Sequence, residues 1–418
     1  MNILFPIVLA VLLTALAGCT STQSVAPLDV AIESSHVPLE EEVWAIGQAD
    51  SLHAALLAKG MVSHNKDADR LFSSVKHRLL SDQPKIAEHI RIYLLRSPEA
   101  NAAALPNGVI YINAGLFPIL ENEDQLAAII GHEIAHIVGR HSLRAVITQK
   151  NTFIGAHVAD LMTGGLGLAY IPALASLSSF SRDQEQQADV EALVWLQEAG
   201  YRPEAAVEVF ENFKTVPGAE HNEGSIYSSH PSQDKRIENL EQQLPAAEPV
   251  PSAGPAPSPE FLKVRITQSE AVVRMHLRDH RYILAETDLD RIEVFIPAQS
   301  RIQYYRGEVY FGRAQHPGDA TREAHWIETG NSNFAAANFA LMEDIKEQNL
   351  ELAILHYTRA ASEAPRQADA MKRLGEVYLY QGDSERAIYW LEHYLSMQPG
   401  TGDARYAQSL LDKARKQT

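Results

Sequence analysis

Residues 132–136 read His132-Glu133-Ile134-Ala135-His136 and lie inside an apolar segment that extends to His141. Apolar residues recur on both sides of this stretch at steps of three and four, which predicts a helix with a buried face. At helical spacing the two histidines project from one face, one turn apart, and Glu133 on the adjacent flank can reach a water bound to the same metal ion. The stretch therefore predicts a zinc site on a helix.

A catalytic zinc site takes three protein ligands and leaves one position open, so a third ligand is required. The pattern His-Glu-x-x-His-x-x-Gly-x-x-His is excluded, because only one residue separates Gly139 from His141. The other candidate is the stretch 181–189, which opens an amphipathic helix and places Glu185 and Asp189 on one face. One carboxylate can complete a set of two histidines and a glutamate, and the other can orient a ligand histidine.

Together these motifs resemble the HtpX-like and CAAX-prenyl-endopeptidase zinc metallopeptidases, a gluzincin family, and especially its envelope members with tetratricopeptide repeats. The resemblance covers about the middle half of the chain. It is carried by Asn101-Ala102, Pro106-Asn107-Gly108, Asn122-Glu123-Asp124-Gln125-Leu126-Ala127, the stretch 132–136 with His141, Ser181-Arg182 with Glu185 and Ala188-Asp189, and Ser229-His230-Pro231 with Arg236.

The resemblance implies a role for each residue of the site. One zinc ion per chain would be bound by His132, His136 and Glu185. Glu133 would act as the general base, and Asp189 would hold His132 in orientation from the side away from the metal ion.

His230 and Arg236 resemble a pair that lies near the zinc ion in this family, and two roles remain open for them. Both are chemically suited to stabilise an oxyanion, whereas a neutral His230 can instead occupy the open metal position and block it. A solvated histidine at a helix start is the plain structural alternative. Gln187 departs from the glutamate that many relatives have, at a position that is not a ligand.

The composition limits the class of protein. A chain of 418 residues with 45% hydrophobic residues is long enough for two or three domains. The formal net charge of −17 argues against nucleic acid or an anionic membrane surface as a partner. Cys19 is the sole cysteine, which excludes an intrachain disulfide and a thiolate metal cluster.

The first 18 residues contain an apolar run and read as a signal peptide. Its ending, Leu16-Ala17-Gly18-Cys19, resembles a bacterial lipobox, although the region before the apolar run lacks Lys and Arg. The resemblance implies lipidation of Cys19 and anchoring at the periplasmic face of the outer membrane, because Thr20 follows the cysteine. The stretch up to residue 36 is rich in Ser, Thr and Ala without apolar periodicity, so we expect a flexible, lipid-anchored tether at residues 19–36. An ordinary signal peptide with an incidental cysteine is the alternative.

We expect a metallopeptidase domain at residues 37–244. Apolar periodicity predicts two helices within residues 40–81, broken near Gly60. The β-prone runs 90–95 and 109–113 predict a small antiparallel sheet, whose edge in this family can pair with an extended peptide. Further helices are predicted at 203–213 and from Pro231.

Residues 161–180 carry no charged side chain. Their length invites a membrane-spanning interpretation. A span would place His136 and Glu185 on opposite sides of the bilayer, so a buried or lid-like segment with glycine hinges is favoured. A re-entrant membrane contact remains open.

The stretch 245–259 contains six prolines and predicts an extended linker. Beyond it the sequence repeats with a period of about 34 residues, which is typical of tetratricopeptide repeats. Residues 334–367 and 368–401 match well and 300–333 more loosely. We therefore expect a mainly α-helical chain with a small antiparallel β-sheet, in which a gluzincin-type metallopeptidase domain precedes a helical repeat array at residues 260–418.

The resemblance implies a zinc-dependent endopeptidase of the bacterial envelope that degrades misfolded or stalled outer-membrane proteins. The repeats would recruit substrates or partners, including an outer-membrane assembly machine. The alternative is a chaperone-like adaptor or assembly factor whose zinc site is latent or structural. An inactive relative would more naturally have lost Glu133, so the residues favour the enzyme.

Overall fold

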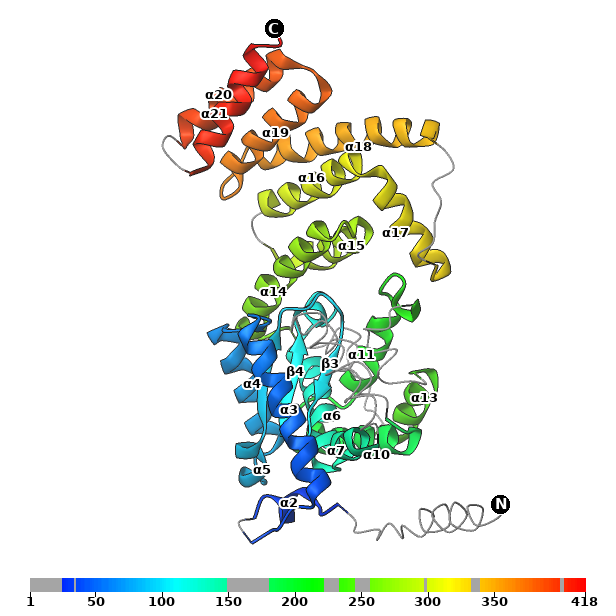
Figure 1. The fold of residues 1–418 in the computed structure, drawn as a ribbon. Coiled ribbons are helices and arrows are strands. Elements are labelled where there is room, and N and C mark those ends of the chain that lie inside the picture. Colours follow the sequence, from blue (N-terminus) through cyan, green and yellow to red (C-terminus); the bar gives the residue numbers. More distant parts are fainter. Residues whose placement is uncertain are drawn as a thin grey trace, which may run out of the picture.

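The computed structural model describes residues 25–33, 35–148, 180–221, 233–244, 256–296, 299–331, 339–398 and 402–418. Figure 1 shows a body that contains the sheet and a column of helices that rises from it. The chain is mainly α-helical with one small sheet, as the sequence predicts. Among the described residues, no helix combines the length and the apolarity that crossing a bilayer requires.

The N-terminal part of the body is helical. It consists of α2 (Leu28–Ala31), α3 (Glu40–Ala58), α4 (Lys66–Leu79) and α5 (Pro84–His89). The prediction of two helices within residues 40–81 is confirmed. Asn65 begins α4, since its side chain accepts hydrogen bonds from the backbone N–H groups of Asp67 and Ala68 at 3.0 and 3.1 Å.

The sheet has the strand order β1-β2-β4-β3 and is mixed. Its strands are β1 (Val62–Ser63), β2 (Arg91–Leu95), β3 (Ala102–Ala104) and β4 (Val109–Asn113). The two predicted strands exist, but the antiparallel pairing is wrong, because β2 and β4 run parallel. The chain crosses over after β2, forms β3 at the far edge, and turns at Gly108 (φ 79°) into β4. This hairpin inserts β4 between β2 and β3.

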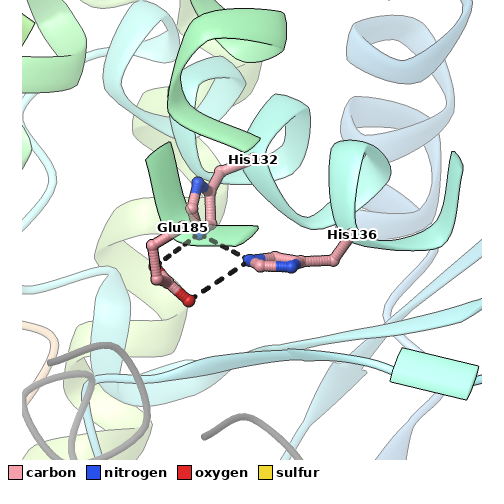
Figure 2. Close-up of side chains that lie close together, drawn as sticks. All are labelled: His132, His136 and Glu185. Atoms are coloured by element: carbon pink, nitrogen blue, oxygen red, sulfur yellow. Dashed lines mark hydrogen bonds and ion pairs between the residues drawn. The ribbon is translucent and has the colours of Figure 1, made fainter. Parts of the chain in front are cut away.

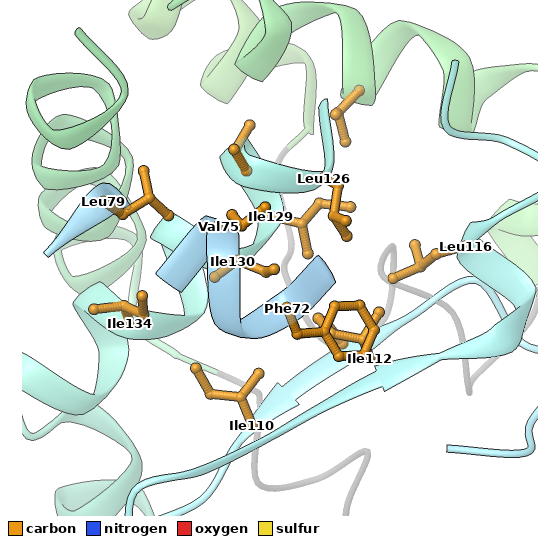
Figure 3. Packing of buried hydrophobic residues seen from close by; sticks show 14 of the residues in the cluster. Phe72, Val75, Leu79, Ile110, Ile112, Leu116, Leu126, Ile129, Ile130 and Ile134 are labelled. Carbon is orange, nitrogen blue, oxygen red and sulfur yellow. The ribbon is translucent and has the colours of Figure 1, made fainter. Parts of the chain in front are cut away.

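Helix α6 (Glu123–Val138) runs through the centre of the body, and every residue from Gln125 to Ile137 is buried. A helix that is buried on all sides needs partners on all sides. Figure 3 shows side chains of α4 and β4 packed against its apolar residues. They are Phe72, Val75 and Leu79 of α4, Ile110 and Ile112 of β4, and Leu126, Ile129, Ile130 and Ile134 of α6.

The remaining helices of the body surround α6. They are η1 (Ala114–Leu116), α7 (His141–Thr148), α10 (Arg182–Glu198), α11 (Ala205–Lys214), η2 (Ala219–His221) and α13 (Gln233–Gln243). Helices α10 and α11 pack against α6, and α13 packs against both of them. The helix predicted at 203–213 is therefore confirmed, with its start shifted by two residues, and the helix predicted from Pro231 is confirmed over the described residues 233–243.

Helix α14 (Pro259–Arg278) follows the proline-rich stretch, yet it belongs to the core of the body. Phe261 and Val264 are fully buried there, and the ring centroid of Phe261 lies 6.5 Å from that of Phe117. Ser258 caps α14 and donates a hydrogen bond to Glu123 Oε2 at 2.7 Å, which links the starts of α14 and α6. The hydrophobic core therefore continues past residues 245–259.

We expect Phe261→Ala to lower the free energy of unfolding of the body by about 3–5 kcal/mol, because it removes a buried aromatic side chain. The neighbouring Leu262 is only partly buried, so Leu262→Ala serves as the control and should cost much less. Chemical denaturation followed by tryptophan fluorescence measures both. Equal losses in the two variants would show that α14 does not pack into the body.

The column consists of helices that pack against their neighbours. They are α15 (Tyr282–Ile292), η3 (Glu293–Phe295), α16 (Gln299–Gln315), α17 (Pro317–Thr329), α18 (Phe339–Ala360), α19 (Gln367–Gln381), α20 (Ser384–Met397) and α21 (Gly402–Arg415). Helix α16 packs on α18, α19 on α20, and α20 on α21 (Figure 1). One of the contacts with the body lies where Trp326 of α17 meets Gly218 and His221.

The two predicted repeats differ in one respect. Helix α19 ends at Gly382, whose φ of 84° favours glycine, and α20 follows directly, as a tetratricopeptide repeat requires. Gln348 stands 34 residues earlier, where a helix-ending glycine is missing, and α18 continues through it as one helix. The assignment of the column to tetratricopeptide repeats stays a prediction.

Candidate metal centre

Helix α6 is bounded by local sequence signals. Asn122 accepts a hydrogen bond from the backbone N–H of Gln125 at 3.0 Å, which caps the first turn. At the other end Arg140 adopts φ 56°, and its guanidinium pairs with the buried Glu42 of α3 at 3.2 Å. This left-handed residue stops α6 and turns the chain into α7, so that His141 comes back beside His136.

Three side chains from two helices converge at the middle of α6. His132 Nε2 and His136 Nε2 lie 3.0 Å apart. Each of these nitrogens lies 3.5 Å from a carboxylate oxygen of Glu185 on α10. Figure 2 shows the three side chains pointing toward one another. All three residues are buried.

Helix α10 presents two of its acidic residues, Glu185 and Asp189, to α6. Ser181 starts the helix with a capping box, in which Ser181 and Gln184 each bond the other's backbone N–H. Glu185 and Asp189 follow one turn apart on the face that packs on α6, and Asp189 Oδ1 lies 3.1 Å from His132 Nδ1. His132 therefore offers one ring nitrogen to the cluster and the other to a carboxylate.

Arg236 of α13 lies on the outer side of these carboxylates, and only 5% of its surface is exposed. It donates to both oxygens of Asp189 at 2.6 and 2.9 Å, and its Nη1 lies 2.7 Å from Glu185 Oε2. Its cation also lies 4.5 Å from the ring centroid of Phe210. This geometry fixes the two carboxylates, and Arg236 also lines the pocket beside His132 and Glu133.

The charges of the cluster shift its ionisation. Burial and the Arg236 cation lower the pKa of His132, but hydrogen bonds with Asp189 and Glu185 outweigh them and raise it to about 9. Burial alone would raise the pKa of Asp189, yet Arg236 holds it below its ordinary value. Asp189 is therefore ionised at neutral pH and available to orient His132.

His136 has its own outer partner. Its Nδ1 lies 3.0 Å from His141 Nδ1, and His141 Nε2 lies 3.2 Å from Gln187 Oε1. Phe180 stacks on the His136 ring with centroids 3.8 Å apart. Burial lowers the pKa of His141. The sequence showed only that His141 cannot be a metzincin-type ligand, and its contact with His136 follows from the turn at Arg140.

The donor set fits a zinc ion. Zinc in proteins prefers histidine nitrogen and carboxylate oxygen in a set of three, and each ligand histidine usually bonds an outer partner through its second nitrogen. His132 meets this condition through Asp189, and His136 meets it through His141. Glu185 supplies the carboxylate.

Glu133 lies next to this cluster and is buried, with 1% of its surface exposed. Together with His132, Asp189 and Arg236 it lines a small pocket, whose other walls are mainly apolar side chains of α6, α11 and α13. The apolar part comes from Ala128, Ile129, Ala206, Val209, Phe210 and Leu240. The carboxylate is therefore placed beside both the cluster and a pocket that can hold a water molecule.

Several predicted features lie outside the described residues. They are Cys19, the greater part of the uncharged stretch 161–180, and His230. The structure brings together the other predicted site residues, which are His132, Glu133, His136, Glu185, Asp189 and Arg236.

Comparison with known proteins agrees with this geometry. Residues 67–244 match Peptidase family M48. The matched range contains every residue of the cluster. The narrower resemblance to the HtpX-like and CAAX-prenyl-endopeptidase branches stays a prediction.

Individual relatives cover the same part of the chain. The Mitochondrial metalloendopeptidase OMA1 of Schizosaccharomyces pombe is 31% identical over 159 residues, which is 38% of this chain and 47% of that protein. The Beta-barrel assembly-enhancing protease of Yersinia pestis is 25% identical over 206 residues, 46% of this chain and 42% of that protein. The Metalloprotease YcaL of Escherichia coli is 26% identical over 161 residues, which is 37% of this chain and 61% of that protein. The match thus spans less than half of the first two relatives.

Proposed function

We propose that the chain is a zinc-dependent endopeptidase that binds one zinc ion through His132, His136 and Glu185. The observation that carries this proposal is the convergence of two histidine Nε2 atoms and a carboxylate within 3.5 Å of one another, beside a buried glutamate. The metallopeptidase names of the relatives support the same reaction.

Zinc, when bound, supplies a Lewis acid that polarises the scissile carbonyl and makes water more acidic. The carboxylate of Glu133 takes a proton from the attacking water and donates it to the nitrogen of the leaving amine. Asp189 holds the ring of His132 through Nδ1, and Arg236 holds Asp189 and Glu185 in place. We therefore infer that Arg236 acts as a positioning residue.

The substrate side of the site includes a free sheet edge. β3 is the last strand of the sheet, it contacts α6, and its outer edge has no partner strand among the described residues. An extended peptide can add to such an edge through backbone hydrogen bonds. This supports hydrolysis within an unfolded segment of a protein substrate.

We propose further that the chain acts in the bacterial envelope on misfolded or stalled outer-membrane proteins. One group of relatives is named beta-barrel assembly-enhancing protease, which supports this setting. The column of helices offers exposed aromatic side chains, including Tyr389 and Tyr406, that can contact a partner such as an assembly machine.

Zinc analysis combined with a protease assay tests the proposed function. Purified full-length chain should contain one zinc ion and hydrolyse unfolded casein. Removal of zinc with a chelator should stop hydrolysis, and added zinc should restore it. A zinc-loaded chain that leaves casein and denatured outer-membrane proteins intact would favour the second candidate, an adaptor whose helices bind partners around a structural zinc site.

We propose that Cys19 carries a lipid anchor, because it is the sole cysteine and ends a lipobox-like sequence. In bacteria that process lipoproteins, Cys19→Ser should abolish labelling by a palmitate analogue and release the chain from the membrane fraction. Continued labelling of the variant would contradict the proposal. A neighbouring substitution, Thr20→Ser, is the control and should label normally.

The variant His230→Ala distinguishes two opposite roles of His230. If it occupies the open metal position, His230→Ala should increase casein hydrolysis, and this is the result that we expect, because imidazole is a competent zinc ligand at neutral pH. If it stabilises the oxyanion, the same variant should lose activity by about tenfold to a thousandfold. A fall in activity with unchanged zinc content would contradict the blocking role.

A further inference from the structure

A chain of hydrogen bonds leads from the metal cluster to the surface of α10. His136 Nδ1 meets His141 Nδ1 at 3.0 Å, His141 Nε2 meets Gln187 Oε1 at 3.2 Å, and Gln187 Nε2 donates to Glu191 Oε1 at 3.0 Å. The chain links four residues from three helices. None of the three outer residues belongs to the proposed ligand set.

The direction of the protons in this chain follows from its outer end. A carboxylate accepts hydrogen bonds, so Glu191 requires the NH₂ group of Gln187 to face it. The carbonyl oxygen of Gln187 then faces His141, which must donate through Nε2–H. A neutral imidazole has a single N–H, so Nδ1 of His141 carries the lone pair and accepts a hydrogen bond from Nδ1–H of His136.

Binding of a metal ion at the inner end of the chain requires the same direction. With its proton on Nδ1, His136 has a lone pair on Nε2, and that atom is the one that lies beside His132 and Glu185. The opposite direction would place a proton on Nε2 of His136, pointing at the cluster. A metal ion binds the lone pair and not the N–H.

The surroundings prevent the two histidines from exchanging this hydrogen bond for one with water. His136 and His141 are 0% and 1% exposed, and Phe180 covers one face of His136. The backbone at Gly139 also packs closely against His141, because a Cβ atom at Gly139 would lie 2.6 Å from its Nε2. A side chain at Gly139 would therefore push His141 out of place.

We propose that His141 is a positioning residue, which fixes His136 in the tautomer that offers Nε2 to the metal ion, and that Gln187 and Glu191 set its direction. The part of this inference that concerns metal affinity rests on the proposed zinc site. The tautomer itself is a property of the metal-free chain and can be tested without zinc.

The first experiment measures zinc affinity of the full-length chain by competition with a chromogenic chelator. His141→Leu removes the acceptor and should weaken zinc binding by about 10–100-fold, as for other outer partners of ligand histidines. His141→Asn places an amide oxygen near the position of Nδ1 and should keep most of the affinity. Equal losses of zinc affinity in both variants would show that His141 acts only through packing. Unchanged zinc affinity in His141→Leu would overturn the inference.

Substitutions at Gln187 test the direction without disturbing the core, because this side chain is exposed. Gln187→Glu keeps an acceptor opposite His141 and should retain zinc affinity, whereas Gln187→Lys offers only a donor and should lower it. Glu198→Gln on the same helix is the control and should change nothing. Identical affinities for the lysine and glutamate variants would refute the directing role of Gln187.

The second experiment observes the tautomer directly. Long-range ¹⁵N–¹H spectra of the metal-free chain, labelled at histidine, should show His136 protonated at Nδ1, and this signal should change in His141→Leu but persist in His141→Asn. A proton on Nε2 of His136 would overturn the inference. If the wild type shows the expected tautomer but binds no zinc, the proposed function fails and the tautomer assignment stands.

Discussion

Glu133→Gln is expected to keep its zinc and to lose casein hydrolysis by at least about 100-fold, the scale on which general bases contribute. The amide has nearly the same shape as the carboxylate, so the buried position on α6 remains filled. It cannot take the proton of the attacking water. The ligand set of His132, His136 and Glu185 is untouched, which separates the role of the base from that of the metal ion.

The matched control is Glu121→Gln, which removes an exposed negative charge just before α6. It should leave both zinc content and hydrolysis at the wild-type level. Zinc content is measured by elemental analysis, and hydrolysis by release of labelled casein peptides. Wild-type turnover in Glu133→Gln would remove Glu133 from the mechanism, and loss of zinc in that variant would place it among the ligands.

Glu185→Ala is expected to lower zinc affinity by more than about 100-fold, because a direct ligand should contribute at least as much as the outer partners of ligand histidines do. Hydrolysis should fall with the zinc content. Glu198→Ala, three turns along α10, is the control and should bind zinc normally. Equal zinc content in the wild type and Glu185→Ala would reject Glu185 as the third ligand.

This variant also changes a buried ion pair. Glu185→Ala leaves Nη1 of Arg236 without the carboxylate that lies 2.7 Å away, so the metal-free chain should be destabilised as well. Arg236→Met in the same background removes the cation and should recover part of that stability without recovering zinc. Unfolding curves of the metal-free variants separate this effect from metal binding.

The central helix and its residues could be predicted from the sequence because their signals are local. The steps of three and four around His132, the acidic start of α6, and the Ser181 start of α10 each depend on a few neighbouring residues. Two long helices that each carry polar residues on an otherwise apolar face must pack those faces together. The convergence of Glu185 with His132 and His136 follows from this packing.

The features that escaped prediction depend on residues far apart in the sequence. The parallel pairing of β2 and β4 is decided by β3, three alanines whose strand character is weak. The function of Arg236 depends on the carboxylates of Asp189 and Glu185, which lie 47 and 51 residues before it in the sequence. The partner of His136 depends on the left-handed conformation of Arg140, which its sequence does not demand.

Helix α14 determines how the chain can be divided and recombined. The match to the peptidase family ends at residue 244, whereas the core of the body extends to Val272. A fragment that ends at the proline-rich stretch would lack Phe261 and leave a cavity in the core of the body. Such a fragment is a poor starting point for crystallisation or inhibitor screening. For the same reason, exchange of the helical column between related proteins requires that the new column bring a helix with a large apolar residue at this place.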